Sequence, residues 1–175
     1  MADRAAFAPL KLDRAVTCAA LDRHASRAAL DIWREAARWL VEEGRQLWPP
    51  AIFDDGFVTD ARARGVILGA AIDGWVAGVA LLQWRDELWW PDRPADGAAY
   101  VHKVAVARAA AGRGVADALV AECERRARGR GIGILRLDTA RDRPKLCALY
   151  ERLGFRPIDV RTVGSFVGIR YEKQL

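Results

Sequence analysis

The stretch that decides the fold covers residues 100–116 and reads YVHKVAVARAAAGRGVA. Its alternating and partly β-branched first half predicts a strand over 99–107, and its end begins a predicted helix over 115–128. Gly112 and Gly114 lie in the turn between them, where glycine adopts conformations closed to other residues and lets a ligand approach the main chain. The first amides of a helix lack partners within it, so this turn could bind an anion such as a pyrophosphate.

Taken alone, this turn is not specific. Arg113 could add a charge-assisted contact to a phosphate, but a Gly-x-Gly turn before a helix also occurs without any ligand. The Gly-Lys-Ser/Thr of a P-loop is absent, and the third glycine of a dinucleotide fingerprint is missing.

A second motif, LYERLGF at residues 149–155, raises the specificity. It ends a predicted helix over 144–153, in which Pro144 suits the first turn and Gly154 the C-terminal cap. Tyr150 lies one turn before the end of this helix. The pairing of Gly-x-Gly-hydrophobic-Ala-x-x-Leu with Leu-Tyr-Glu-x-Leu-Gly-Phe resembles the GNAT superfamily of acetyl-CoA-dependent N-acetyltransferases, over roughly residues 66–160.

The rest of the chain predicts an α/β fold with a mixed, mostly antiparallel central sheet flanked by helices. Apolar residues at helical spacing predict a helix over 26–44 with Ser26 as its N-cap, and Asp73-Gly74 predicts a hairpin. Further expected elements are a short helical turn at 60–64, a loop over 85–98, and strands over 66–71, 75–84, 134–137, 158–162 and 165–172. We expect a single domain over 1–175, in which residues 1–24 could form a loosely attached arm with a short strand.

The resemblance implies a site for acetyl-CoA. In this family the strand matching 101–106 splays away from the strand matching 135–137, and the cofactor's pantetheine arm enters the gap. The backbone of Val104, Ala105 and Val106 would hold that arm. The turn of Gly112, Arg113, Gly114, Val115 and Ala116 would hold the pyrophosphate.

The resemblance also implies direct transfer of the acetyl group to a primary amine of a small molecule or peptide. Tyr150 matches the family's tyrosine near the thioester sulfur, where it would act as general acid to the CoA thiolate; a phenol is protonated at pH 7. The alternative is a core tyrosine. His102 is the candidate general base, although by strand parity it could point into the domain. Asp138, Asp86, Glu87 or a water relay could replace it.

Two positions depart from the family pattern. Ala111 stands where an arginine or glutamine usually opens the phosphate turn, and Arg143 stands where an asparagine often precedes the tyrosine helix. Arg143 and Lys145 could instead contact the CoA 3′-phosphate, or be solvated. These departures support one alternative function, a non-catalytic acyl-CoA-binding regulatory module of the same fold.

Aromatic residues suggest where the acceptor amine binds. Trp84, Trp89 and Trp90 cluster near Glu87 at the end of a predicted strand and in the loop after it. Adjacent tryptophans are hard to bury together, so they could line an acceptor pocket and attract a cationic amine with the nearby acids. Plain loop packing is the alternative.

Composition excludes several other classes of protein. No apolar run approaches the roughly 20 residues of a membrane span, and no signal peptide is visible, so we expect a cytoplasmic protein with no membrane partner. Three dispersed cysteines without a CxxC predict neither disulfides nor a metal site. The net charge of +5 could favour nucleic acid, but no basic–aromatic ladder appears, so none is expected. A monomer or a homodimer would be compatible with the sequence.

Overall fold

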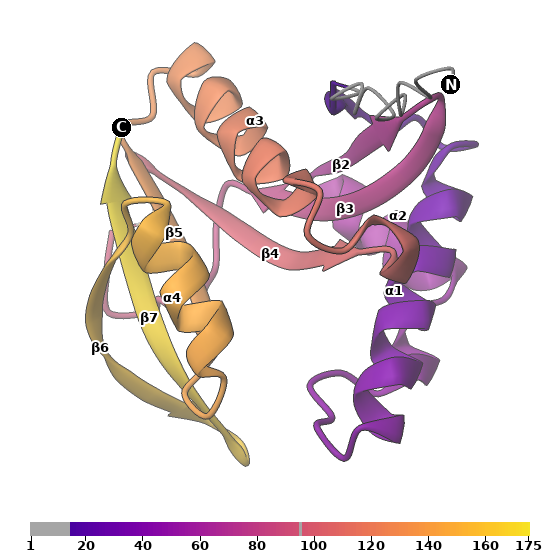
Figure 1. Ribbon diagram of the computed structural model, residues 1–175. Coiled ribbons are helices and arrows are strands. Elements are labelled where there is room, and N and C mark those ends of the chain that lie inside the picture. Colours follow the sequence, from indigo (N-terminus) through magenta and orange to yellow (C-terminus); the bar gives the residue numbers. More distant parts are fainter. Residues whose placement is uncertain (1–14, 95) are drawn as a thin grey trace, which may run out of the picture.

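A computed structural model describes residues 15–94 and 96–175 (Figure 1). The part of the predicted N-terminal arm before residue 15 lies outside the described residues. Seven strands form one sheet in the order β1-β2-β3-β4-β5-β7-β6. They are β1 (Thr17–Ala20), β2 (Gly65–Ile72), β3 (Trp75–Gln83), β4 (Ala98–Val106), β5 (Ile134–Ala140), β6 (Arg156–Val163) and β7 (Phe166–Gln174). Among the described strands, only β4 and β5 pair in parallel, which confirms the predicted mixed, mostly antiparallel sheet.

Helices cover both faces of the sheet. They are α1 (Ser26–Glu42), α2 (Asp55–Arg64), α3 (Val115–Gly129) and α4 (Pro144–Arg152), with 3-10 turns η1 (Pro50–Ile52) and η2 (Arg108–Ala110). Alternation along β3 assigns the two faces: Val79 and Leu81 pack in the cluster with α1 and α2, whereas Ala80 and Leu82 pack in the cluster with α3 and α4. No helix in the described part of the chain is long and apolar enough to cross a membrane.

Two helix starts differ from the prediction. Ser26 is not the cap of α1, because Ala25 holds the cap position and the Ser26 hydroxyl donates to the Asp22 carbonyl at 2.6 Å. The helical turn predicted at 60–64 is a longer helix, α2, because the Asp54 carboxylate accepts the Phe57 amide at 2.7 Å and caps it five residues earlier. In both places an aspartate before the helix accepts hydrogen bonds from its start: Asp22 from Ala25 and Ser26, and Asp54 from Phe57.

Strand β4 is irregular halfway along its length. Val79 of β3 pairs with Ala105 of β4, and Leu81 pairs with His102. Between these two pairs β3 covers two residues and β4 covers three, so β4 carries a bulge. Lys103, inside the bulge, has a left-handed φ of 52°. The Trp33 indole N–H of α1 donates to the Lys103 carbonyl at 2.6 Å and holds this backbone in place.

The predicted splay of β4 from β5 is confirmed. The two strands pair from Ala98↔Ile134 to Val101↔Leu137 and no further. Beyond this point they diverge, and the sheet opens into a V (Figure 1). Residues 102–106 of β4 therefore present an edge toward β5 without strand hydrogen bonds.

Candidate active site

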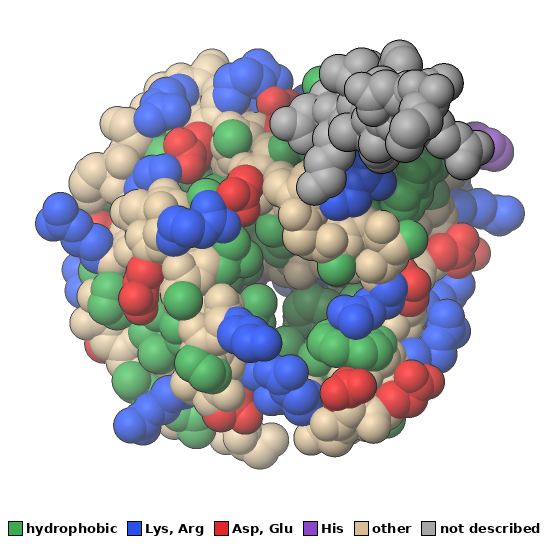
Figure 2. Space-filling view, viewed as in Figure 1, with side chains coloured by type: hydrophobic (Ala, Val, Ile, Leu, Met, Phe, Trp, Pro, Cys, Tyr) green, Lys and Arg blue, Asp and Glu red, His purple; other side chains and the backbone are tan. Residues whose placement is uncertain are grey.

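A cavity of about 250 Å³ lies where β4 and β5 separate. Figure 2 shows the corresponding face hollowed at its centre, with apolar side chains around the opening. The walls come from α1 and the segment after it, β4, β5 and α4, together with Trp89 and Phe166. The lining residues are Ala36, Trp39, Leu40, Leu47, Trp48, Trp89, Val101, His102, Lys103, Val104, Ala105, Val106, Arg108, Asp138, Thr139, Ala140, Leu146, Tyr150 and Phe166.

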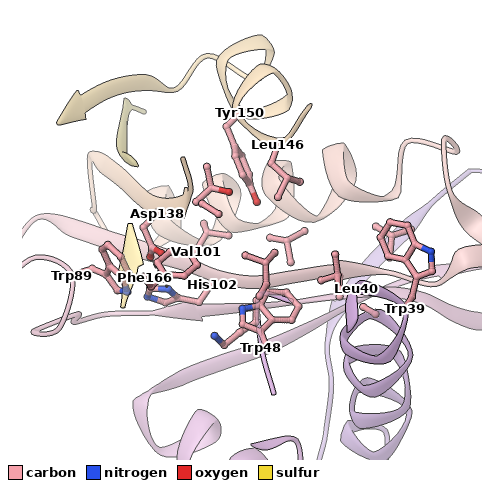
Figure 3. Close-up of a pocket in the computed structure, with 18 of the residues that line it drawn as sticks. Trp39, Leu40, Trp48, Trp89, Val101, His102, Asp138, Leu146, Tyr150 and Phe166 are labelled. Carbon is pink, nitrogen blue, oxygen red and sulfur yellow. Dashed lines mark ion pairs between the residues drawn. The ribbon is translucent and has the colours of Figure 1, made fainter. Parts of the chain in front are cut away.

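Tyr150 projects from α4 into this cavity with its hydroxyl toward the centre (Figure 3). The ring packs edge-on against Phe155, with centroids 6.0 Å apart, and against Tyr171. The hydroxyl has no hydrogen-bond partner among the described residues. Burial, and then the charge of Asp138, raise the pKa of Tyr150, so the phenol stays protonated at neutral pH.

His102 lies between two carboxylates that the fold brings from different elements. Its Nε2 is 3.4 Å from Oδ2 of Asp86, in the loop after β3, and its Nδ1 is 3.7 Å from Oδ1 of Asp138 on β5. Asp86 is held in place because its Oδ1 accepts the amides of Leu88 and Trp89 at 3.1 and 2.9 Å. Asp86 Oδ2 and His102 Nε2 are buried and lack a hydrogen bond to any described residue.

Burial controls the charges of this cluster. It lowers the pKa of His102 to about 4, against the opposing effect of Asp86, so the imidazole is neutral at pH 7. Burial, followed by the charge of Asp86, raises the pKa of Asp138 to about 7. The cluster can therefore take up or release a proton near neutral pH.

These three side chains could also hold a metal ion, because their ligand atoms lie within 4.8 Å of one another. Two features favour proton exchange instead. The two ring nitrogens face different carboxylates, so the imidazole bridges the acids. The positive charge of Lys103 also acts on His102 and Asp138, and would oppose a divalent metal ion about twice as strongly as a singly charged ammonium.

The turn before α3 has the geometry of an anion site. Gly112 and Gly114 adopt left-handed φ values of 75° and 74°, and a Cβ at either position would meet open space. The amides of Gly114, Val115 and Ala116 donate to no other residue in the described part of the chain. The Arg113 amide is already used by the Ala110 carbonyl at 3.2 Å, so Arg113 offers only its exposed side chain.

The comparisons with known proteins agree with this geometry. The profile of the Acetyltransferase (GNAT) family matches residues 31–155. The chain belongs to the GNAT acetyltransferase family. No curated protein matches it.

Solved structures share the GNAT fold with this chain. A GNAT-family acetyltransferase from Listeria monocytogenes has a TM-score of 0.74 at 22% identity, over 91% of this chain and 95% of its own. PaiA N-acetyltransferase from Thermoplasma acidophilum, in complex with coenzyme A, has a TM-score of 0.72 at 16% identity, and the match covers 92% of this chain and 99% of that protein. The ribosomal-protein-S18-alanine N-acetyltransferase from Escherichia coli has a TM-score of 0.69 at 18% identity, and the match covers 91% of this chain and 94% of that protein. At these identities the likeness concerns the fold.

The tryptophans predicted to bind the acceptor are distributed over three places in this GNAT acetyltransferase. Trp89 lines the cavity. Trp90 is 2% exposed and lies beneath the Arg136 and Arg170 guanidiniums, so the structure buries two adjacent tryptophans that we expected to be hard to bury together. Trp84 stacks on Arg130 at 4.1 Å and, with Glu87, lines a separate hollow.

The two basic residues predicted near the cofactor also differ from each other. Arg143 is buried, not solvated, and its Nη2 donates to the Arg45 carbonyl at 2.7 Å, which joins the start of α4 to the segment after α1. Lys145 is exposed and free to meet an anion. Sequence reasoning missed Lys103, Trp48 and Phe166 in the cavity wall, because only the bulge and the chain crossings bring them there.

Proposed function

We propose that this protein is an N-acetyltransferase that moves an acetyl group from acetyl-CoA directly to a primary amine. The observation that carries the proposal is that the Tyr150 hydroxyl and the His102 cluster line one cavity beside the unpaired edge of β4. A proton donor and a proton acceptor thus face the same small volume. Solved neighbours described as N-acetyltransferases, one of them in complex with coenzyme A, add support.

The residues present fit acetyl-CoA, which would supply an acetyl thioester. Backbone groups of Val104, Ala105 and Val106 lack a strand partner on the β5 side and can bind the amides of the pantetheine arm. Free amides of Gly114, Val115 and Ala116, with the α3 dipole, can bind the pyrophosphate, and no side chain at Gly112 obstructs the approach. Arg113 and Lys145 are exposed and can neutralise phosphate charge.

The cavity supplies each proton step of the transfer. The acceptor ammonium first loses a proton to the Asp86–His102–Asp138 cluster, through the neutral imidazole or the Asp138 carboxylate. The free amine then attacks the thioester carbonyl carbon, and a backbone N–H of β4 stabilises the oxygen that becomes negative. As the carbon–sulfur bond breaks, the Tyr150 hydroxyl donates its proton to the departing sulfur. The attacking nitrogen, which is positively charged after the attack, returns its excess proton to the Tyr150 oxygen, so that a neutral amide and a neutral thiol leave. Holding the two reactants side by side contributes further.

A regulatory module that binds acyl-CoA without turnover is the second candidate. Two observations favour it: Ala111 offers the phosphates no side chain, and the Arg143 guanidinium is engaged by the Arg45 carbonyl. Phosphate binding then depends on the backbone amides of the turn before α3 and on the side chains of Arg113 and Lys145.

Calorimetric titration with acetyl-CoA and dephospho-CoA, together with amine-dependent release of CoA thiol over an amine panel, tests the proposal. We expect micromolar binding of acetyl-CoA, and turnover that falls about 10²- to 10⁴-fold in Tyr150→Phe while binding is kept. Weaker binding of dephospho-CoA would place a basic residue, Lys145 first, on the 3′-phosphate. Tight binding without turnover of any amine would instead favour the regulatory module, and no binding would contradict both functions.

A further inference from the structure

Lys103 is a cation inside the cavity that forms no ion pair with a described residue. Its ammonium lies 5.0 Å from the centroid of the Trp48 ring, and neither a hydrogen bond nor an ion pair joins it to any residue in the described part of the chain. Burial lowers the pKa of Lys103, although the charge of Asp138 opposes this effect. A partly buried ammonium in this state gains from an anion brought by a ligand.

The backbone of Lys103 explains how the side chain reaches this position. A φ of 52° is uncommon for a residue with a side chain, and such outliers concentrate at functional sites. The bulge adds one residue to β4 between His102 and Ala105. His102 and Lys103 are two of the six consecutive β4 residues, Val101 to Val106, that line the cavity. The bulge interrupts the regular alternation of side chains between the two faces at this point.

The rest of the acceptor side of the cavity is aromatic. Trp48 comes from the segment after α1, Trp89 from the loop after β3, and Phe166 from the start of β7. The Trp89 and Phe166 rings meet edge-on with centroids 5.5 Å apart. Figure 3 shows Trp89, Phe166, His102 and Asp138 grouped together, with Trp48 along the same side of the cavity. The cavity is smaller than the roughly 300–1,000 Å³ of typical sites for drug-sized ligands, so it suits a small acceptor.

We propose that the acceptor is a small amino carboxylate with an apolar or aromatic body, its amine at His102 and Asp138 and its carboxylate on Lys103. The proposal rests on the N-acetyltransferase function and assigns its substrate class. The two charges of opposite sign on such a molecule match the His102–Asp138 pair and the Lys103 ammonium, which line the same cavity, and the aromatic wall matches the apolar body beside them. Lys103 is thereby a specificity residue, which touches the substrate and takes no part in proton transfer.

The test compares phenylalanine with phenylalaninamide and phenethylamine, which replace the carboxylate by a neutral amide or by hydrogen. Thiol release from acetyl-CoA gives kcat/KM for each acceptor in the wild type, Lys103→Met, Lys103→Arg and the surface control Arg128→Met. Specificity is the kcat/KM for phenylalanine divided by the kcat/KM for phenethylamine. This ratio is compared between the wild type and each variant, so the difference in basicity between the two amines cancels. Lys103→Gly fits the left-handed backbone and serves if Lys103→Met fails to fold.

We expect the wild type to prefer phenylalanine, and Lys103→Met to lower its kcat/KM by about 10- to 100-fold through KM. Phenethylamine turnover changes little, Lys103→Arg keeps part of the preference, and Arg128→Met keeps all of it. Equal ratios in the wild type and Lys103→Met, or a wild-type preference for phenethylamine, would overturn the assignment while leaving the N-acetyltransferase function intact.

A binding measurement separates the two proposals. If no acceptor releases thiol, the N-acetyltransferase function fails. Calorimetry with N-acetylphenylalanine and N-acetylphenethylamine, in the presence of CoA, then tests the carboxylate site directly. Tighter binding of the acid that disappears in Lys103→Met supports the site, and equal binding overturns it.

Discussion

Two polar clusters lie along β4, and they differ in whether their charges find partners. The structural cluster comprises Arg136, Arg170 and their partners around Trp90. Arg170 donates to Asp92, to Asp159 at 2.6 and 2.7 Å, and to the Trp89 carbonyl at 2.9 Å. Arg136 donates to Glu172, to the Pro94 carbonyl, and to the Tyr100 hydroxyl of β4 at 3.1 Å.

The cavity cluster lies just beyond Tyr100. It comprises His102 and Lys103 of β4 and Asp138 of β5, which line the cavity, and Asp86, which approaches His102 from the loop after β3. Here Asp86 Oδ2 and His102 Nε2 are buried 3.4 Å apart without a hydrogen bond to any described residue, and neither a hydrogen bond nor an ion pair joins the Lys103 ammonium to the described chain. Buried polar groups are normally satisfied. The Trp90 indole N–H in the first cluster also lacks a hydrogen bond, so the clusters differ in their charges: those of the first are paired within the fold, whereas the Lys103 ammonium of the second is left available to a ligand.

The largest expected effect is on turnover, in His102→Gln. Removal of the imidazole takes away the bridge between Asp86 and Asp138, and kcat/KM should fall about 10²- to 10³-fold. The melting temperature should stay within about 2 °C of wild type, because no hydrogen bond of the described fold depends on this ring. A large loss of thermal stability would mean that the cavity cluster is structural after all.

The pH profile of turnover should report Asp138. With its pKa raised to about 7, this carboxyl is protonated below neutral pH and cannot accept a proton there. Wild-type kcat/KM should therefore rise with pH and level off above about pH 7, for an acceptor whose own amine titrates above pH 9. Asp138→Asn should remove this inflection and lower the plateau about 10- to 100-fold. An unchanged inflection in Asp138→Asn would assign the titration elsewhere.

In the structural cluster, the substitution Arg170→Met should act on stability. The guanidinium is buried and makes charge-assisted bonds, so thermal melting at pH 7 should fall by roughly 5–10 °C. The same guanidinium lowers the pKa of Asp92 and Asp159, so its stabilisation is present above their ordinary pKa and is lost as pH falls below it. The difference from wild type should shrink near pH 2. Acetyl-CoA binding by the folded variant serves as the control.

The smallest expected effect is a gain of thermal stability in Asp138→Asn, opposite in sign to the loss in Arg170→Met. The raised pKa of Asp138 means that the fold favours its protonated form, so the charged form costs stability as pH rises from about 4 through 7. Asp138→Asn should therefore melt roughly 2–4 °C higher than wild type at pH 8, and no higher at pH 4. Lower stability at pH 8 would show that the Asp138 carboxylate is well paired in the fold.

Local sequence signals predicted most elements correctly. The alternation of 99–107, the Asp73-Gly74 turn, Pro144 and Gly154 all act within a few residues, so the strands, hairpin and helices they mark can be inferred from one sequence. The helix cap at Asp54 was missed because an aspartate is equally common in loops. Tyr150, which its motif singles out, and His102, which its place in the strand before the glycine turn singles out, both line the cavity, and their catalytic roles stay predictions.

What the sequence by itself determined is the order of elements, the glycine turn and the side chains available for chemistry, because these depend on propensity and spacing along the chain. Tertiary structure alone decided which of them meet. The bulge at Lys103 depends on the Trp33 indole 70 residues away, and the His102 cluster joins residues from three separate segments. Burial, which sets the proton affinities of His102 and Asp138 and lowers that of Lys103, arises only when the sheet and helices pack.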